Sequence, residues 1–284
     1  MPSKIISIFI LLILSSFSSK ALDYNILWNV QKHTTQIKTV SKDTAGDEFD
    51  NRKKSTVNLI QGKSSTQMLS YYQLYLEEKD QPRADSLMYD ILKKDSAIDL
   101  KYKISLISYS YTSDTKTEML FLSDAGRLGE YRAYFLKYNI STLKSNKYIR
   151  AHYYNLVALD SAWYQITPDS LIRVQMARHY NSLAWYSILT QQLGNVEYYL
   201  TQSIKYNPDS RYPYSNLPLL FLLTNHYQKA KALYLKYKDQ PFDRTIPTYK
   251  DEFLEDFKEL KEAGIMNSDM QKIIRLLNKN NRHK

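Results

Sequence analysis

Histidine is the residue type best suited to proton transfer or metal binding near neutral pH. The chain has five histidines, and no two of them stand four residues apart, so the zinc motif His-Glu-x-x-His is missing. The five are His33, His152, His179, His226 and His283. We interpret His179 and His226 as surface or edge residues. The carboxylates of Asp251, Glu255 and Glu259 recur at helical spacing, which is typical of a solvated helix face. The sequence therefore predicts no catalytic residue and no metal site.

The chain has no cysteine, which excludes disulfides, thiol catalysis and cysteine-ligated metals. It also has no nucleophile-elbow serine, phosphate-binding loop or dinucleotide glycine fingerprint, and only 6 glycines in all. We therefore expect no cofactor. An enzyme remains the least favoured class, and its site would have to lie in residues 99–176, the region that the sequence patterns explain least.

The formal net charge is +10, yet the basic residues are spread along the chain. The one dense basic run, Arg52-Lys53-Lys54, is short and follows acidic residues. A nucleic-acid interface would show clustered Lys and Arg on one element, so no nucleic-acid partner is expected. Peripheral contact with an acidic surface of the cell envelope stays open. The 26 tyrosines suit a core with hydroxyls at its edge, and a minority of them could line a groove.

The first residues have the features of an export signal. Lys4 supplies a positive start, residues 5–14 are apolar, and Ser19-Lys20-Ala21 fits a small-x-small cleavage site. The apolar stretch is shorter than the roughly 20 residues that span a bilayer. We expect a periplasmic or secreted protein, with a retained N-terminal membrane anchor as the alternative.

Apolar residues recur at helical spacing along most of the chain, and no sustained alternation demands a strand. Thr115 with Glu118 resembles a capping box, and Thr167-Pro168 predicts a helix start. Asp160-Ser161 and Asp169-Ser170 recur as an Asp-Ser pattern, which suits helix starts and turns or O-glycosylation acceptors. Helices are predicted at 24–40, 66–78, 83–94, 98–110, 130–138 and 145–163.

One apolar pattern occurs twice, 34 residues apart and without a gap. Positions three, four and seven apart share one helix face, so this period predicts a repeated pair of packed helices. The first copy comprises Tyr180, Leu183, Ala184, Leu193, Val196, Leu200 and Ser203. The second comprises Tyr214, Leu217, Pro218, Tyr227, Ala230, Tyr234 and Tyr237.

The pattern over 177–243 resembles the tetratricopeptide repeat (TPR), a unit of two antiparallel helices. Leu183-Ala184 match the Leu-Gly pair of its first helix, and Pro208 matches its terminal proline. A fainter unit fits residues 65–98. The resemblance implies a solenoid of helix hairpins whose role is to bind a partner.

Two features depart from the family pattern. Pro218 stands inside the expected helix, where proline costs about 3 kcal/mol. We therefore predict a late helix start, capped by Ser215 or Asn216. The turn glycine of the family is replaced by Gln191 and Asn225.

The end of the chain resembles the tail that follows such repeats. Phe253, Leu254, Phe257 and Leu260 form an apolar stripe, and Asn267 or Ser268 is expected to cap a last helix. The predicted fold class is all-α, a TPR-like helix-hairpin solenoid with C-terminal capping helices. Its parts are a signal peptide (1–21), an N-terminal helix and polar loop (22–64), degenerate TPR-like helices (65–176), two TPR units (177–243) and capping helices (244–284).

In TPR proteins, partners bind a concave face lined by certain positions of the first helix of each unit. The resemblance implies that these positions are Arg178, Asn181, Trp185, Tyr212, Ser215 and Leu219. Arginine and aromatic side chains anchor most interfaces, so Trp185 and Arg178 are the foremost candidates. The Lys and Asn set of the family's two-carboxylate clamp has no counterpart here.

The leading hypothesis is an exported, non-enzymatic scaffold that binds a protein or peptide partner in the cell envelope. The alternative is a module that binds glycans or surface polymers, as the tyrosines and the positive charge suggest.

Overall fold

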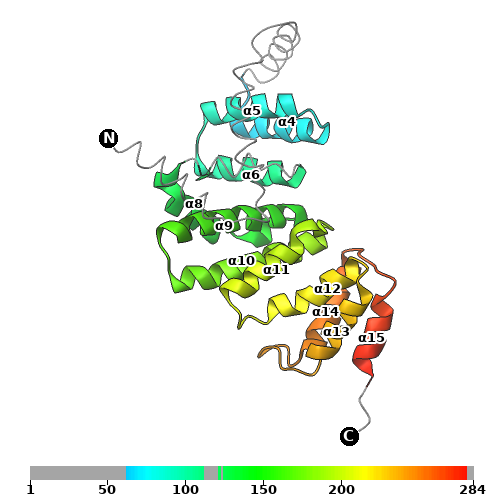
Figure 1. Ribbon diagram of the computed structural model, residues 1–284. Coiled ribbons are helices and arrows are strands. Elements are labelled where there is room, and N and C mark those ends of the chain that lie inside the picture. Colours follow the sequence, from blue (N-terminus) through cyan, green and yellow to red (C-terminus); the bar gives the residue numbers. More distant parts are fainter. Residues whose placement is uncertain (1–61, 112–120, 123, 280–284) are drawn as a thin grey trace, which may run out of the picture. The chain divides into compact units, whose positions relative to one another are not determined.

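The structure is a computed structural model that describes residues 62–111, 121–122 and 124–279 (Figure 1). Within these ranges every regular element is a helix, apart from one isolated bridge between Pro241 and Thr248. The all-α prediction is therefore confirmed for this part of the chain. The predicted signal peptide, the helix at 24–40 and the Thr115 capping box lie outside the described residues.

The chain divides into two compact units, residues 1–131 and 132–284. In the first, α4 (Ser65–Glu77) packs on α5 (Gln81–Lys94), and α6 (Ile98–Tyr111) contacts both. The predicted helices at 66–78, 83–94 and 98–110 match these within two residues. A capping box starts α4, with Ser64 as its N-cap.

Helix α8 (Leu128–Lys137) spans the division between the units. The described part of the second unit continues with seven helices, and each packs on the next along the chain, as α10 does on α11 and α12 on α13 (Figure 1). They are α9 (Asn146–Ile166), α10 (Ser170–Leu189), α11 (Val196–Tyr206), α12 (Tyr212–Leu223), α13 (Tyr227–Tyr237), α14 (Tyr249–Glu262) and α15 (Met270–Asn278).

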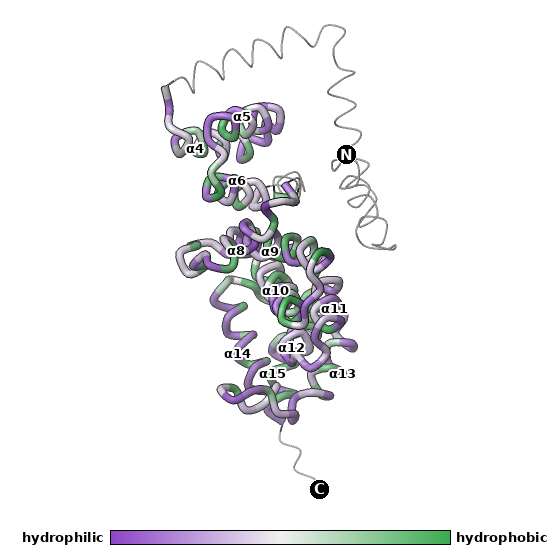
Figure 2. Tube along the Cα trace, turned by 90° about the vertical axis from the view of Figure 1, so that its left-hand side faces the viewer, coloured by the Kyte–Doolittle hydropathy of each residue, from purple (hydrophilic) through white to green (hydrophobic). Residues whose placement is uncertain are grey.

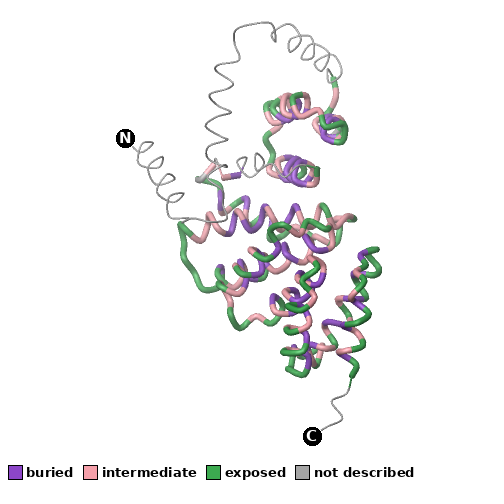
Figure 3. The backbone as a smooth tube through the Cα atoms, turned by 45° about the vertical axis from the view of Figure 1, so that its right-hand side comes forward, coloured by how far each residue is buried: buried purple, intermediate pink, exposed green. Residues whose placement is uncertain are grey.

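One continuous core holds the second unit together. Hydrophilic and hydrophobic stretches alternate along the helices (Figure 2), and buried residues alternate with exposed ones (Figure 3), as amphipathic helices require. Two small residues of the repeated pattern, Ala184 and Ala230, are fully buried in this core. Buried Ser203 donates a hydrogen bond to the carbonyl oxygen of Ala177 at 2.7 Å, which ties α11 to α10.

The turns inside the helix pairs share one geometry. Lys79, Gln191 and Asn225 all adopt positive φ, at 61°, 55° and 63°. In each turn the following residue donates a backbone hydrogen bond to the carbonyl five residues earlier, for example Gln192 to Ser187 at 2.8 Å. This is the Schellman helix ending, which favours glycine but tolerates Asn. Gly264, at φ 73°, ends α14 in the same way.

Helix α12 corrects the prediction for Pro218. The helix begins at Tyr212 with Pro213 in its first turn, and Pro218 lies inside it. Ser215 and Asn216 are therefore helical and buried rather than caps. The buried Leu219, Leu220 and Leu222 show why the helix forms in spite of the proline, since their packing offsets the lost backbone hydrogen bond.

Three further start signals were misassigned. Thr167 is the C-cap of α9, and Asp169 is the N-cap of α10, so Pro168 precedes the helix instead of opening it. Asp160 lies inside α9 and not at a helix start. Asp269 is the N-cap of α15, while Asn267 instead accepts a hydrogen bond from the Asp269 N–H at 2.8 Å.

The apolar stripe of the predicted capping helix is confirmed. Phe253, Phe257 and Leu260 on α14 are buried, and Leu254 packs against the same core. Tyr234 of α13 meets the ring of Phe253 edge-on, with centroids 4.7 Å apart. The stripe thus fixes which side of α14 faces the core and which side stays outside.

Candidate partner-binding face

The six residues predicted for the groove divide by exposure. Arg178 on α10 and Tyr212 on α12 are exposed, and Asn181 and Trp185 are partly exposed. Ser215 and Leu219 are each only 1% exposed, so their side chains belong to the interior of the fold. Four of the six therefore remain accessible to a partner.

Asn181 links two of the helices that carry these residues. Its carboxamide oxygen accepts a hydrogen bond from the side chain of buried Asn216 on α12 at 3.1 Å. The Ser215 hydroxyl, on the same helix, donates to the Tyr212 carbonyl at 2.8 Å. These polar groups are satisfied by hydrogen bonds inside the fold. Asn181 therefore acts mainly as a link between α10 and α12.

Tyr212 is the meeting point of three elements. Its hydroxyl donates to Asp243, in the loop after α13, at 2.8 Å. This hydrogen bond is the main reason that the pKa of Tyr212 is raised. The negative charge of Glu252 on α14 raises that pKa further, and the positive charge of Arg178 on α10 opposes the rise. Side chains from α10, α12 and α14 therefore interact electrostatically at this surface.

Asp243 is a fixed negative charge beside Tyr212. The backbone N–H of Ile246 donates to its carboxylate at 2.8 Å, and the N–H and hydroxyl of Thr245 donate at 2.7 and 2.8 Å. These hydrogen bonds, with that from Ile246 foremost, hold the pKa of the carboxyl far below its usual range. Asp243 is thus ionised across the whole physiological range.

A row of acids on α14 continues from this point. Glu252, Asp256 and Glu259 follow one another at spacings of four and three residues, so they share one flank of the helix. Burial raises the pKa of Glu252 to about 7, and the charges of Asp243 and Glu259 add to the rise. We call Glu252, Asp256 and Glu259 the acidic flank.

Asp256 is the most enclosed member of the acidic flank. Its Oδ2 atom is buried and has no hydrogen-bond partner. Burial, followed by the charges of Glu252 and Glu259, raises the pKa of Asp256 well above its usual range. An unsatisfied carboxylate oxygen of this kind is unfavourable in a folded protein.

Tyr186 connects the acidic flank to α10. The pKa of this half-buried tyrosine is raised by burial, then by Tyr153, and also by the charge of Glu259. Its ring stacks on that of Tyr153 from α9 at 5.7 Å with the planes 16° apart. The stacked pair of Tyr153 and Tyr186 therefore lies within electrostatic range of the acidic flank.

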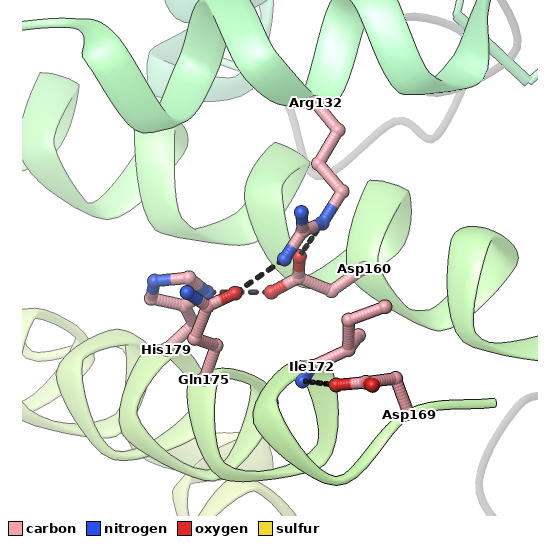
Figure 4. A network of polar contacts seen from close by, with 6 residues as sticks. All are labelled: Arg132, Asp160, Asp169, Ile172, Gln175 and His179. Carbon is pink, nitrogen blue, oxygen red and sulfur yellow. Dashed lines mark hydrogen bonds and ion pairs between the residues drawn. The ribbon is translucent and has the colours of Figure 1, made fainter. Parts of the chain in front are cut away.

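A second polar cluster, which we call the Asp160 network, is buried between α8, α9 and α10 (Figure 4). The fully buried carboxylate of Asp160 accepts from Arg132 Nε at 2.6 Å and lies 2.5 Å from His179 Nδ1. Arg132 also donates to Gln175 at 2.5 Å. His179 is partly exposed, in agreement with its prediction as a surface or edge residue, but it also holds a buried carboxylate, which the sequence did not indicate.

An imidazole held by a carboxylate is the arrangement that orients a general base. Here the guanidinium of Arg132 also binds this carboxylate. The Asp160 network is therefore a charge-compensated connection between three helices. Nearby His152 is buried and stacks on Phe135 at 5.5 Å. Burial, with a smaller effect of the charge on His179, lowers the pKa of His152 to about 4, so it stays neutral in the fold.

An aromatic cleft forms a third candidate site, beside the end of α13. Its volume is about 430 Å³. Tyr237 stacks on Tyr249 there with centroids 5.3 Å apart, and Arg211 and Lys236 supply positive charge. The remaining lining residues are Pro208, Asp209, Ser210, Tyr214, Gln240 and Pro241.

The described ranges contain no group of three or more His, Cys, Asp or Glu side chains placed to hold a metal ion. In the same part of the chain, no helix combines the length and the apolar character that crossing a membrane requires. Comparison with known proteins gave no match to any family model, curated protein or solved structure.

Sequence reasoning missed both buried carboxylates, although one of them left a signal. Asp256 stands three residues after Phe253 and four before Leu260, both in the recognised apolar stripe, so its position next to the core could be deduced. Asp160 and His179 lie 19 residues apart on different helices, and no local pattern joins them.

Proposed function

We propose that this chain is a TPR-like scaffold of the cell envelope that binds a protein or peptide partner and carries out no reaction of its own. The 34-residue register supports the proposal, because its two copies coincide with the packed pairs α10 with α11 and α12 with α13. The equivalent turns at Gln191 and Asn225, and the similar turn at Lys79, support a repeated unit further.

The observation that carries the binding site is the convergence of α10, α12 and α14. Arg178, Tyr212 and Glu252 come from these three helices and influence one another electrostatically. Trp185 lies two turns after Arg178 on α10 and is partly exposed. A face with an arginine, a tryptophan and a tyrosine has the composition of an interface hot spot.

The test uses the full chain, immobilised and exposed to envelope extract. We expect the double variant Arg178→Ala with Trp185→Ala to lose a partner that the unaltered protein retains. Arg173→Ala, which removes another exposed arginine of α10, is the matched control and should retain it. Circular dichroism checks that both variants stay folded. Equal retention by the double variant would place the partner elsewhere.

The aromatic cleft supports a second candidate function, the binding of a glycan or surface polymer. Stacked tyrosines next to Arg211, Lys236 and Gln240 offer rings for sugar faces and donors for hydroxyl or carboxylate groups. Titration with a neutral and a uronic-acid oligosaccharide tests it. Binding that resists salt and weakens in Lys236→Ala with Gln240→Ala would favour this function over the first.

An enzyme with a site in residues 99–176 is the third and least supported class. The polar groups that this region contributes to the Asp160 network, Arg132, Asp160 and Gln175, already satisfy one another. Such a network supports a role in holding helices together more than a role in chemistry.

A further inference from the structure

The acidic flank of α14 is only weakly compensated within the described part of the chain, where Lys258 favours the charge of one of its acids, Glu259. Neither Glu252, Asp256 nor Glu259 forms an ion pair or a hydrogen bond through its side chain there. Glu259 also lies in the C-terminal half of α14, where the helix dipole disfavours negative charge. Placing the three acids next to one another therefore costs electrostatic free energy.

The groups that face the acidic flank from other elements do not relieve this cost. Tyr234 on α13 is buried beside Asp256, and its pKa is raised by burial and by that carboxylate. The loop after α13 contributes only Asp243, a further negative charge. From α12 and α10 come Tyr212 and Tyr186, which are neutral at physiological pH.

Two cations lie near the acidic flank, but neither pairs with it. Lys258 on α14 is paired with Glu255 at 2.8 Å, although its charge also opposes the rise in the pKa of Glu259. Arg178 on α10 lowers the pKa of Tyr212 and forms no ion pair among the described residues. Carboxyl groups therefore outnumber positive charges at this site.

We propose that the acidic flank receives lysine or arginine side chains of a basic, extended segment of a partner protein. The inference rests on the proposed binding function and adds the chemistry of the partner. The unsatisfied Oδ2 of Asp256 shows that the fold itself supplies no donor to this carboxyl group, although buried polar atoms in folded proteins are normally satisfied. Tyr186 and Tyr212 lie within electrostatic range of the acids, and a tyrosine ring is a surface on which a cation is favoured.

The other ligands of such a site fit less well. A bound metal ion would need a cluster of ligands, and the described residues contain no suitable group of three. An anionic membrane surface would be repelled by the negative charge of the acidic flank and of Asp243. A basic peptide matches both the charge and the aromatic border.

The charge state of Glu252 gives the interaction a pH dependence. The pKa of Glu252 is about 7 in the free protein, so part of the population is protonated at neutral pH. A bound ammonium or guanidinium group favours the ionised form and releases that proton. Affinity should therefore rise as the pH increases from 6 to 8.

The experiment is a titration of the full chain with fluorescent heptalysine and with a neutral glycine-serine peptide of equal length. We expect heptalysine to bind in spite of the chain's formal net charge of +10, and the neutral peptide not to bind. Glu252→Gln with Glu259→Gln should weaken heptalysine binding at least tenfold. Glu197→Gln, which alters an exposed glutamate on α11, is the control and should change it less than twofold.

Asp256→Asn provides an independent variant, because it removes the buried carboxyl group and leaves Glu252 and Glu259 in place. It should weaken heptalysine binding as well, without lowering the thermal unfolding temperature. Unchanged binding in the Glu252/Glu259 variant, or equal binding of the neutral peptide, would overturn the proposal. So would an affinity that stays constant between pH 6 and 8.

Failure of this inference is distinguishable from failure of the proposed function. If an envelope partner needs Arg178 and Trp185 but binds the Glu252/Glu259 variant normally, the binding face stands and the partner is not basic. If heptalysine binds the acidic flank but no partner depends on Arg178 and Trp185, the acidic site stands and the face on α10 does not.

Discussion

Asp160 and Asp256 are both aspartates placed inside helices of the second unit, but only one of them has partners. Asp160 receives Arg132 on one oxygen and His179 on the other, at 2.6 and 2.5 Å. Asp256 has a buried oxygen with no partner and acidic neighbours on its own helix. The same functional group is thus neutralised at one place and left uncompensated at the other.

The difference separates residues that hold the fold from residues that are available for binding. A buried carboxylate costs several kcal/mol unless it is paired and hydrogen-bonded. The Asp160 network meets that condition inside the chain and joins α8, α9 and α10. The acidic flank does not meet it, and sites that bind ligands commonly store such a cost in the free protein.

The largest effect is expected from Arg132→Ala, which leaves the buried Asp160 carboxylate without its main counter-charge. We expect the free energy of unfolding of the second unit to fall by about 3–5 kcal/mol, the usual loss when one member of a buried pair is removed. Urea unfolding followed by circular dichroism measures it. Arg173→Ala, on the exposed face of α10, serves as control and should change it by less than about 0.5 kcal/mol.

A double variant tests whether charge imbalance is the reason. Arg132→Met with Asp160→Leu removes both charges, so it should lose less stability than Arg132→Ala alone. A loss at least as large would show that packing and not charge dominates at the Asp160 network.

Asp256→Asn should raise the free energy of unfolding, whereas Arg132→Ala should lower it. The amide carries no charge, so burial and the neighbouring glutamates no longer oppose it, and we expect a gain of about 1–3 kcal/mol in the free energy of unfolding at pH 7. Thermal and urea unfolding of the full chain give the value. A loss of stability would mean that Asp256 is satisfied in solution and that it resembles Asp160 after all.

The pH dependence of stability gives a third and smaller contrast, through Glu252. The pKa of Glu252 is about 7 in the fold against 4.5 for an ordinary glutamate, so the folded state binds more protons between these values. Stability should therefore fall as the pH rises from about 4.5 to 7. Because Glu252 is partly exposed, we expect this decrease in the free energy of unfolding to be about 1–2 kcal/mol across the window. Glu252→Gln should abolish the decrease.

Urea midpoints of the Glu252→Gln variant and the unaltered chain at pH 4.5, 6 and 8 measure this difference. His152 adds the opposite trend at the lower end, because it is neutral in the fold and must be protonated as the pH falls towards 4. It is common to both proteins, so it cancels in the difference. A difference that does not grow with pH would contradict the raised pKa of Glu252.

Local sequence patterns were sufficient to predict most of the helices in the described part of the chain. The apolar spacing of Phe253, Phe257 and Leu260 fixed both the helix and its buried side. Pro218 shows the limit, because a cost that holds for an isolated helix was outweighed by the packing of buried leucines on α12. Propensity is local, whereas packing depends on residues far away in the chain.

The candidate sites were less predictable for the same reason. The family resemblance named Arg178, Trp185 and Tyr212, which are accessible, but also Ser215 and Leu219, which are buried. Exposure on α12 depends on how the following helices cover it, and no periodicity in the sequence encodes that. The Asp160 network depends on the packing of α8, α9 and α10, which no sequence motif indicates.

The smallest expected effect, from Glu259→Gln, sharpens the comparison most, because it separates burial from like-charge repulsion. Glu259 shares the acidic flank with Asp256 but is exposed, so water screens its charge. We expect Glu259→Gln to raise the free energy of unfolding by no more than about 0.5 kcal/mol, measured by urea unfolding at pH 7. Glu197→Gln on α11 is the matched control. If Glu259→Gln stabilised the chain as much as Asp256→Asn does, repulsion along α14 would be the dominant cost. A small effect instead assigns that cost to burial, which is what a cation bound at Asp256 would relieve.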